Sequence, residues 1–304
     1  MQREIEQQPT VLAENSPRYG EELRAALQGF QPEMVLIAAR GSSDHAALYA
    51  RYLIEVELGI PVSLAAPSVL TRYHRHVSYP RCLAIGISQS GAAPDVSEVL
   101  ESLREAGHRT LAITNTAGSR ITRSSDHSML LGVGEETSIA ATKTYTASLL
   151  ALYHAVVALG GKLADPILPT EEWVEACREA AESQSGLLVR SEPLFALGRG
   201  YAFATAHETA LKLMECALLP CKAYSVADFH HGPKALAGPT SAAIAYSEAV
   251  VDMQTVVPPR CPAPETMKPW HEIIFGQWLA LGAARARGLD PDHVSSLSKV
   301  TRTR

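Results

Sequence analysis

The sequence lacks the features that mark secreted, membrane-spanning and disulfide-rich proteins. Its cysteines are odd in number and show no C-x-x-C spacing, which argues against a disulfide framework and a zinc site (Cys82, Cys177, Cys216, Cys221 and Cys261). No apolar run approaches the roughly 18 residues of a membrane span. Residues 1–9 are charged and lack the apolar core of a signal peptide. We therefore expect reduced thiols and a cytoplasmic location.

Charge is also sparse, and it is not clustered. Charged residues make up 19% of the 304 residues, the formal net charge is −5, and Lys and Arg form no patch. These values argue against a nucleic-acid-binding surface, and no helix-turn-helix module is recognisable. The His, Cys, Asp and Glu residues lack metal-ligand spacing, so we expect no metal ion. We also expect no organic cofactor.

The sequence is rich in apolar residues, and many of them occur in short, regular runs. Apolar residues make up 46% of the chain, which is enough for a large core in one large domain or two ordinary ones. Strand-like runs at 34–39, 61–65, 83–87, 110–114 and 128–131 alternate with helical patterns. This alternation predicts the α/β class, with parallel sheets flanked by helices in three layers.

One pattern occurs twice in the chain. Residues 35–41 and 194–200 each resemble a strand ending in Arg-Gly, and a helix, a proline and another strand follow both. This duplication predicts two tandem subdomains of one topology. We place a helical arm, interrupted by two prolines, at 1–28, the first subdomain at 29–165, the second at 166–287 and a closing tail at 288–304. The second half is shorter, through a deletion or an omitted loop at about 247–265.

Two turns that follow strands carry hydroxyl groups. A Ser-Gln-Ser-Gly turn at 88–91 comes directly before a helix, and the serines at 42–43 hold the same position after another strand. Hydroxyls and unpaired backbone N–H groups at a helix N-terminus suit a phosphate, and such turns border one crevice of a parallel sheet. The alternative is that Ser43 and Ser90 only cap their helices. The phosphate interpretation assigns binding to Ser42, Ser43, Ser88, Gln89 and Ser90.

Three other stretches carry residues suited to proton transfer or sugar binding. Lys212 and Glu215 lie three apart on a largely apolar helix, so Glu215 is a candidate general base; the alternative is an exposed ion pair. His231 stands before Gly-Pro and is either a proton-transfer histidine or a solvent-facing side chain. In the polar loop at 135–144, Thr142 either contacts a sugar or caps the next helix.

Together these motifs resemble those of the SIS (sugar isomerase) superfamily. Within it, the chain is similar from end to end to the isomerase domain of glucosamine-6-phosphate synthase and to stand-alone isomerising glucosamine-6-phosphate deaminases. The resemblance is carried by the opening at 1–9, Arg-Gly-Ser-Ser at 40–43, Ser-Gln-Ser-Gly at 88–91, Thr142-Lys143, the helix at 208–215, His-Gly-Pro at 231–233 and Leu-Ser-Lys-Val-Thr at 297–301.

The resemblance implies a role for each of these positions. The serine turns would bind the sugar phosphate. Glu215 would move a proton between C1 and C2, and Lys212 would polarise that region. His231 would open the sugar ring; in the synthase, this histidine comes from the neighbouring subunit. Lys299 would contact the open-chain sugar near its carbonyl, where the synthase forms a Schiff base. A homodimer is therefore implied.

The chain also departs from the synthase pattern. Ala92-Ala93 stand where the synthase has Glu-Thr, Ala141 stands where it has serine, and we expect no glutaminase domain. The sequence thus predicts an amino-sugar-phosphate isomerase/deaminase that converts glucosamine 6-phosphate, or a close analogue, to fructose 6-phosphate and ammonia. The alternatives are an aldose–ketose phosphosugar isomerase that releases no ammonia and a non-catalytic sugar-phosphate sensor.

Overall fold

The computed structural model describes residues 1–249, 251–293 and 299. Of the expected tail at 288–304, residues 294–298 and 300–304 lie outside the described part, and so does most of the 297–301 motif. The chain divides into two compact units. The first-sheet unit contains Val11–Glu135 and Thr144–Asp165. The second-sheet unit contains Met1–Thr10, Glu136–Lys143 and the described residues from Pro166 onward.

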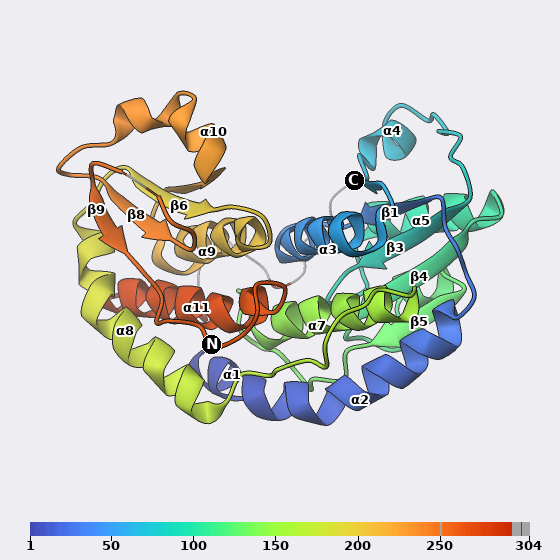
Figure 1. Cartoon of the computed structure of the whole chain (residues 1–304), viewed down its shortest axis with the longest axis horizontal. Helices are drawn as coiled ribbons and strands as arrows, with labels where there is room; N and C mark the ends of the chain where they lie inside the picture. Colours follow the sequence, from blue (N-terminus) through green and yellow to red (C-terminus); the bar gives the residue numbers. More distant parts are fainter. Residues whose placement is uncertain (250, 294–298, 300–304) are drawn as a thin grey trace. The chain divides into compact units, whose positions relative to one another are not determined.

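The first-sheet unit is built on a five-stranded parallel sheet in the order β2-β1-β3-β4-β5 (Figure 1). Its strands are β1 (Met34–Ala38), β2 (Val62–Leu64), β3 (Cys82–Ile87), β4 (Arg109–Thr114) and β5 (His127–Leu130). Its helices are α2 (Gln8–Leu27), α3 (Ser42–Leu58), α4 (Ser68–Thr71), α5 (Pro94–Glu105), α6 (Arg120–Arg123) and α7 (Lys143–Ala158), of which α2 and α7 begin in the second-sheet unit. The alternation of apolar strands and helices that the sequence shows is therefore realised as a wound α/β sheet.

Helices cover both faces of this sheet. Helix α5 packs on the face that presents Leu36, Ala84 and Ala112, and these residues form a buried cluster with its Val96 and Leu100. Helix α3 contacts β1, β2 and β3 but takes no part in this cluster, so it lies on the opposite face. A strand buried on both sides requires the continuous apolar runs found in the sequence.

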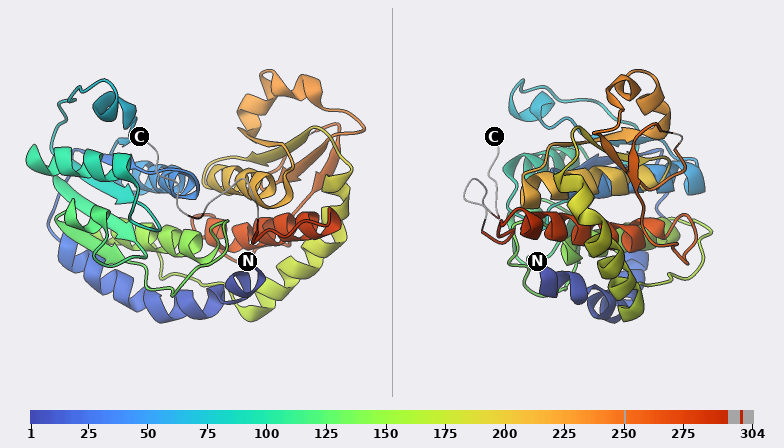
Figure 2. Two further views of the ribbon diagram at one scale, coloured as in Figure 1. Left: turned by 180° about the vertical axis from the view of Figure 1, so that it is seen from behind. Right: turned by 90° about the vertical axis from the view of Figure 1, so that its left-hand side faces the viewer.

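The second-sheet unit has a four-stranded parallel sheet in the order β7-β6-β8-β9. Figure 2 shows most of this unit, coloured yellow to red, from two further sides. Its strands are β6 (Leu194–Gly198), β7 (Cys221–Ser225), β8 (Ala242–Ala245) and β9 (Gln254–Val256). Its helices are α1 (Gln2–Glu6), α8 (Glu171–Val189), α9 (Ala202–Ala217), α10 (Val226–His230), the 3₁₀ turn η1 (Pro233–Leu236) and α11 (Lys268–Ala286). Helix α11 packs against both α8 and α9, which explains why most of it is buried. Even so, none of the helices in the described ranges is long and apolar enough to cross a bilayer.

The two sheets repeat one topology, which confirms the predicted fold class of tandem parallel α/β subdomains. In both, the first strand leads through a helix to an edge strand, and the chain then returns to the other side of the first strand, giving β2-β1-β3 and β7-β6-β8. The second sheet is the smaller one. Strand β9 follows β8 without a crossover helix in residues 246–249 and 251–253, whereas α5 connects β3 to β4. The shortness of the second half therefore falls at this crossover.

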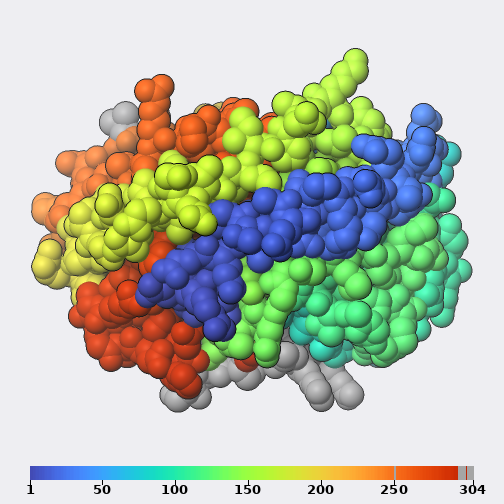
Figure 3. Space-filling model, turned by 90° about the horizontal axis from the view of Figure 1, so that it is seen from below, coloured from blue at the N-terminus to red at the C-terminus, as the bar shows by residue number. Residues whose placement is uncertain are grey.

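The N-terminal arm differs from the prediction that its prolines interrupt it. The break lies at Gln7, between α1 and α2, and α2 then continues through Pro17. Pro9 is the second residue of α2, where the first helical turn tolerates proline. Pro17 is exposed on the outer side of α2, which forms a continuous ridge (Figure 3), while the opposite side is buried through Leu12, Tyr19, Leu23 and Leu27. Burial of this apolar side outweighs the lost backbone hydrogen bond.

Candidate active site

The two serine turns of the first-sheet unit lie at the carboxyl ends of neighbouring strands. Strand β1 pairs with β3 in parallel, with Ala38 opposite Gly86, so the turns that follow them are adjacent. Ser88 is nearly buried, and Gln89 and Ser90 are partly exposed. Among the described residues, the backbone N–H groups of Gln89 and Ser90 donate to no protein group. The sheet therefore brings the predicted phosphate residues together and leaves two donors for an anion.

The capping alternative for these serines does not hold. The N-cap positions of α3 and α5 are Gly41 and Ala93, and neither makes a side-chain cap. Ser90 instead accepts a hydrogen bond from the N–H of Ala92, ahead of the helix, at 3.3 Å. Ala93 itself stands where the resemblance places a threonine, so this turn offers one hydroxyl fewer than the synthase pattern.

An ion pair joins the two serine turns. Arg40, in the first turn, donates to the carboxylate of Asp95 in the first turn of α5 at 2.8 Å, and Asp95 is buried. The pair fixes the turns relative to each other and offsets a negative charge that would otherwise repel an anion. A hollow of about 600 Å³ adjoins the second turn and is lined by Ser90, Gly91, Ala92, Pro94, Thr116, Ser119 and Arg120. Sequence reasoning named Arg40 only as part of the Arg-Gly-Ser-Ser motif and assigned no role to Arg40 or Asp95.

Helix α9 of the second-sheet unit presents a lysine between two carboxylates. The Lys212 ammonium donates to Glu215 at 2.5 Å and lies 3.2 Å from Glu208, three and four residues away along the helix. The side chains of Lys212 and Glu208 are wholly buried, while that of Glu215 is 25% exposed. Burial by itself would lower the pKa of Lys212, but the two carboxylates raise it overall, so the lysine stays charged.

This geometry separates the roles of the two carboxylates. Glu208 neutralises the buried lysine from inside the unit, whereas Glu215 combines contact with a cation and access to solvent. A proton-transfer base must reach its substrate, so Glu215 is the candidate. The alternative prediction, an exposed ion pair, is wrong because the Lys212 side chain is buried. Sequence reasoning assigned no role to Glu208, although its spacing of four from Lys212 was the available signal.

The polar loop at 136–143 belongs to the second-sheet unit and holds Lys299. The Glu136 carboxylate accepts from the backbone N–H and the hydroxyl of Thr142 at 3.0 and 3.2 Å, and its other oxygen accepts from the Lys299 ammonium at 3.1 Å. Lys299 also donates to the backbone carbonyl of Ser138. Glu4 of α1 fixes the same loop by accepting from the backbone N–H groups of Thr137 and Ser138. Thr142 is fully buried, and its role as a sugar contact stays a prediction.

His231 is exposed directly after α10, where its backbone N–H donates to the carbonyl of Asp228 at 3.0 Å. In the part of the chain that the structure describes, no hydrogen bond or ion pair links its ring to Lys212, Glu215 or Lys299. The same part contains no group of three His, Cys, Asp or Glu side chains placed to hold a metal ion. The predicted role of His231 across a subunit interface stays a prediction.

The fold and these two groups of residues define a class of protein. In a parallel α/β sheet, ligands bind in the crevice at the carboxyl ends of the strands, and the paired serine turns lie there. Residues 30–158 match the family model described as the SIS domain. The chain belongs to the SIS superfamily.

The relatives of this chain include an aminotransferase. The chain is 35% identical over 242 residues to glutamine–fructose-6-phosphate aminotransferase (isomerizing) of Methanothermobacter thermautotrophicus, an alignment covering 78% of this chain and 40% of that protein. The chain thus spans less than half the length of this curated relative.

Two solved structures share the fold. The C-terminal domain of glucosamine-fructose-6-phosphate aminotransferase from Francisella tularensis superposes with a TM-score of 0.81 and 23% identity, over 95% of this chain and 96% of that one. Glucosamine-6-phosphate deaminase from Thermotoga maritima superposes with a TM-score of 0.74 and 22% identity, over 96% and 100% of the two chains.

Proposed function

We propose that this protein is an amino-sugar-phosphate isomerase/deaminase that converts glucosamine 6-phosphate, or a close analogue, to fructose 6-phosphate and ammonia. The observation that carries the proposal is the pair formed by a buried, charged Lys212 and a partly exposed Glu215. Proton transfer next to a carbonyl needs a base that reaches the substrate and a cation beside the oxygen that gains charge. The relation to an aminotransferase that isomerises supports an amino sugar as substrate.

The proposed reaction runs through an enolamine. Glu215 removes the proton from C2 of the open-chain sugar, and the electrons of that bond form the C1–C2 double bond while the C1 oxygen gains charge. The field of the Lys212 ammonium favours that charge. Glu215 then returns the proton to C1, and one proton of the C2 amino group passes to the C1 oxygen, which leaves a hydroxyl at C1 and an imine at C2. Addition of water to the imine releases ammonia and leaves the ketone of fructose 6-phosphate, so every atom is accounted for.

The remaining predicted residues complete the proposal. The side chains of the two serine turns and the free N–H groups of Gln89 and Ser90 would hold the phosphate. Lys299, held by Glu136, would contact the sugar near its carbonyl. His231 would open the sugar ring from the neighbouring subunit of a homodimer, and its exposure on one protomer agrees with that role.

A single substitution tests the proposal. Glu215→Gln keeps the size and much of the hydrogen bonding of the side chain but removes its basicity, so turnover should fall by at least about 10²-fold. Ammonia and fructose 6-phosphate are measured separately after addition of glucosamine 6-phosphate. Glu179→Gln, an exposed position on α8, is the matched control and should retain full activity. Full activity of Glu215→Gln would refute the assignment of the base.

The two products also separate the proposal from its alternatives. Equal amounts of ammonia and ketose phosphate support the deaminase. Ketose phosphate formed from an aldose phosphate, with no turnover of any hexosamine phosphate, contradicts it and indicates a simple isomerase. Stabilisation against heat by sugar phosphates without any product contradicts it in favour of a sensor.

A further inference from the structure

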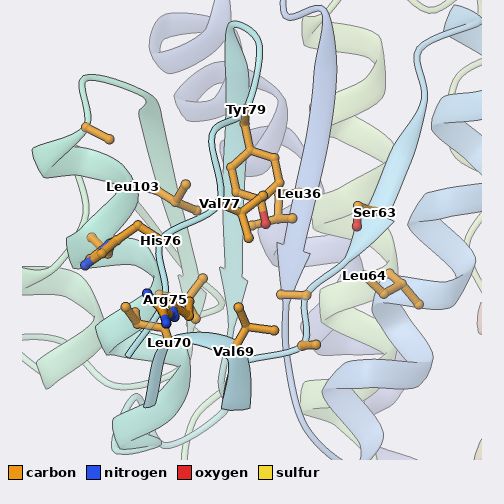
Figure 4. A pocket seen from close by; sticks show the side chains of 15 residues that line it. Leu36, Ser63, Leu64, Val69, Leu70, Arg75, His76, Val77, Tyr79 and Leu103 are labelled. Carbon is orange, nitrogen blue, oxygen red and sulfur yellow. The ribbon is translucent and has the colours of Figure 1, made fainter. Parts of the chain in front are cut away.

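The crossover between β2 and β3 leaves part of the first sheet uncovered by helix. A full-length helix joins β1 to β2 and β3 to β4, but β2 is followed only by the one-turn helix α4 and an irregular segment at 72–81. A pocket of about 220 Å³ opens beneath this segment (Figure 4). It is larger than the ~150 Å³ cavity that is enough to take up benzene in another protein. The pocket can therefore accept a ring with a short side chain.

The pocket is lined mainly by apolar residues from five segments, one of which is β2 with Ser63 and Leu64. Leu36 comes from β1, Val69 and Leu70 from α4, Val77 and Tyr79 from the irregular segment, and Val99 and Leu103 from α5. Figure 4 shows the Tyr79 ring beside Leu36 and Val77. A hydrogen bond of 3.1 Å between His76 and Ser102 ties the irregular segment to α5. An apolar lining with a few polar groups is characteristic of small-molecule sites.

The charge around the pocket has one sign. Arg75 and His76 line it, and the fifteen lining residues include no Asp or Glu. The sequence from Leu58 to Pro94 contains no acidic residue at all, although the whole chain carries a net charge of −5. The Arg75 side chain has no hydrogen-bond or ion-pair partner among the described residues, and Figure 4 shows it near Leu70 at the pocket. This cation is therefore available to a bound anion.

We propose that this pocket binds a small amphipathic monocarboxylate, with its apolar body against Leu36, Val69 and Leu103 and its carboxylate on Arg75. The arginine fork suits a carboxylate, which it can meet through two hydrogen bonds. A sugar phosphate does not suit the site, because its hydroxyl groups would face apolar side chains and lose their hydrogen bonds to water. None of the residues of the two serine turns lines the pocket, so this site is distinct from the phosphate site.

Calorimetric titration with 4-phenylbutyrate tests the proposal without reference to enzyme activity. We expect a dissociation constant of about 1 mM or lower, and binding of the neutral 4-phenylbutanamide that is weaker by about tenfold. Arg75→Gln should weaken binding of the acid by about tenfold and leave that of the amide unchanged. Val77→Asp, at a side chain 48% exposed, should also weaken the acid because it adds a like charge at the pocket.

The matched control is Arg72→Gln. Arg72 belongs to the same basic segment but does not line the pocket, and its guanidinium lies 6.0 Å from the ring centre of Tyr73. Binding of the acid should change less than about twofold in this variant. The proposal is overturned if the acid and the amide bind equally, if Arg72→Gln and Arg75→Gln weaken the acid equally, or if 4-phenylbutyrate gives no saturable binding up to about 10 mM.

Discussion

Glu136 is one side chain that holds groups from distant parts of the chain. Its two oxygens accept hydrogen bonds from Thr142 and from Lys299, which is 163 residues further along the sequence. The carboxylate is fully buried, so its charge depends on these donors in place of water. The position of Lys299 therefore depends on a residue with which it shares no sequence motif.

Substitution of Glu136 should show this dependence. Glu136→Gln keeps the shape of the side chain but removes the charge that neutralises Lys299, so the free energy of unfolding should fall by about 1–3 kcal/mol. Equilibrium unfolding in urea measures the change. Glu135→Gln, at the exposed neighbouring position, should lie within about 0.5 kcal/mol of the native protein. Equal effects of the two substitutions would show that the Glu136 contacts add nothing to stability.

The sequence predicted the roles of some side chains and not those of others. Lys212 and Glu215 were found because a helix brings positions three apart onto one face, and the same rule placed Glu208 within reach. The contact between Glu136 and Lys299 follows no local rule, because the two residues meet only after the loop at 136–143 has packed. Side-chain roles that depend on helical spacing were predictable, whereas roles that depend on long-range packing were not.

The turn between β3 and α5 depends on the glycine at position 91. Gly91 has a φ of +62°, and a Cβ atom at this position would overlap the hydroxyl of Ser119. Its backbone N–H closes the turn by donating to the carbonyl of Ser88 at 3.1 Å. The left-handed backbone and the close packing both require glycine here.

A pair of substitutions separates these two requirements. Gly118 has nearly the same φ, +61°, but no atom lies within 4 Å of the place that a Cβ atom would occupy there. Gly118→Ala should therefore cost only the backbone strain of about 1–2 kcal/mol. Gly91→Ala should cost more, because the turn must also move away from Ser119. Thermal unfolding measures both, and equal costs would contradict the steric part of this explanation.

Strands and long helices were the elements best predicted from the sequence. Runs such as 34–39 and 110–114 became β1 and β4 because a strand buried on both faces needs a continuous apolar run. The prolines of the arm misled the prediction, since Pro17 lies on the outer side of α2 and the helix continues past it. Local rules give the cost of a proline but not the gain from the apolar side that the helix buries.

At the scale of the whole molecule, one buried acid makes stability depend on pH. Glu272 lies on α11, only 4% exposed in the core of the second-sheet unit, and one of its carboxylate oxygens has no hydrogen-bond partner in the described part of the chain. Burial raises its pKa to about 7, against the smaller opposing effect of Lys268, and the nearby Glu265 adds to the increase. The folded protein therefore binds this proton more tightly than the unfolded chain.

Glu272 should make the free energy of unfolding decrease as the pH rises. The stabilisation from protonated Glu272 is complete below its unfolded pKa, near 4.5, and is lost as the pH rises through about 7. Glu272→Gln stays neutral throughout this range. The unfolding free energy of the variant minus that of the native protein should therefore rise by up to about 3 kcal/mol between these pH values. Urea unfolding from pH 5 to 8 measures the shift. Parallel pH profiles of the two proteins would contradict a raised pKa, whatever constant offset the amide adds.

The sequence by itself determined the α/β class, the repetition of one topology, the two serine turns and the helix that carries Lys212 and Glu215. These features follow from apolar periodicity, from turn residues and from spacing along a single helix, all of which are local. Only the tertiary structure decided which charges are buried, that Glu136 holds Lys299, and that a short crossover leaves a basic, apolar pocket beside β1. Burial and long-range contacts arise when separate segments pack together, and no short stretch of sequence contains that information.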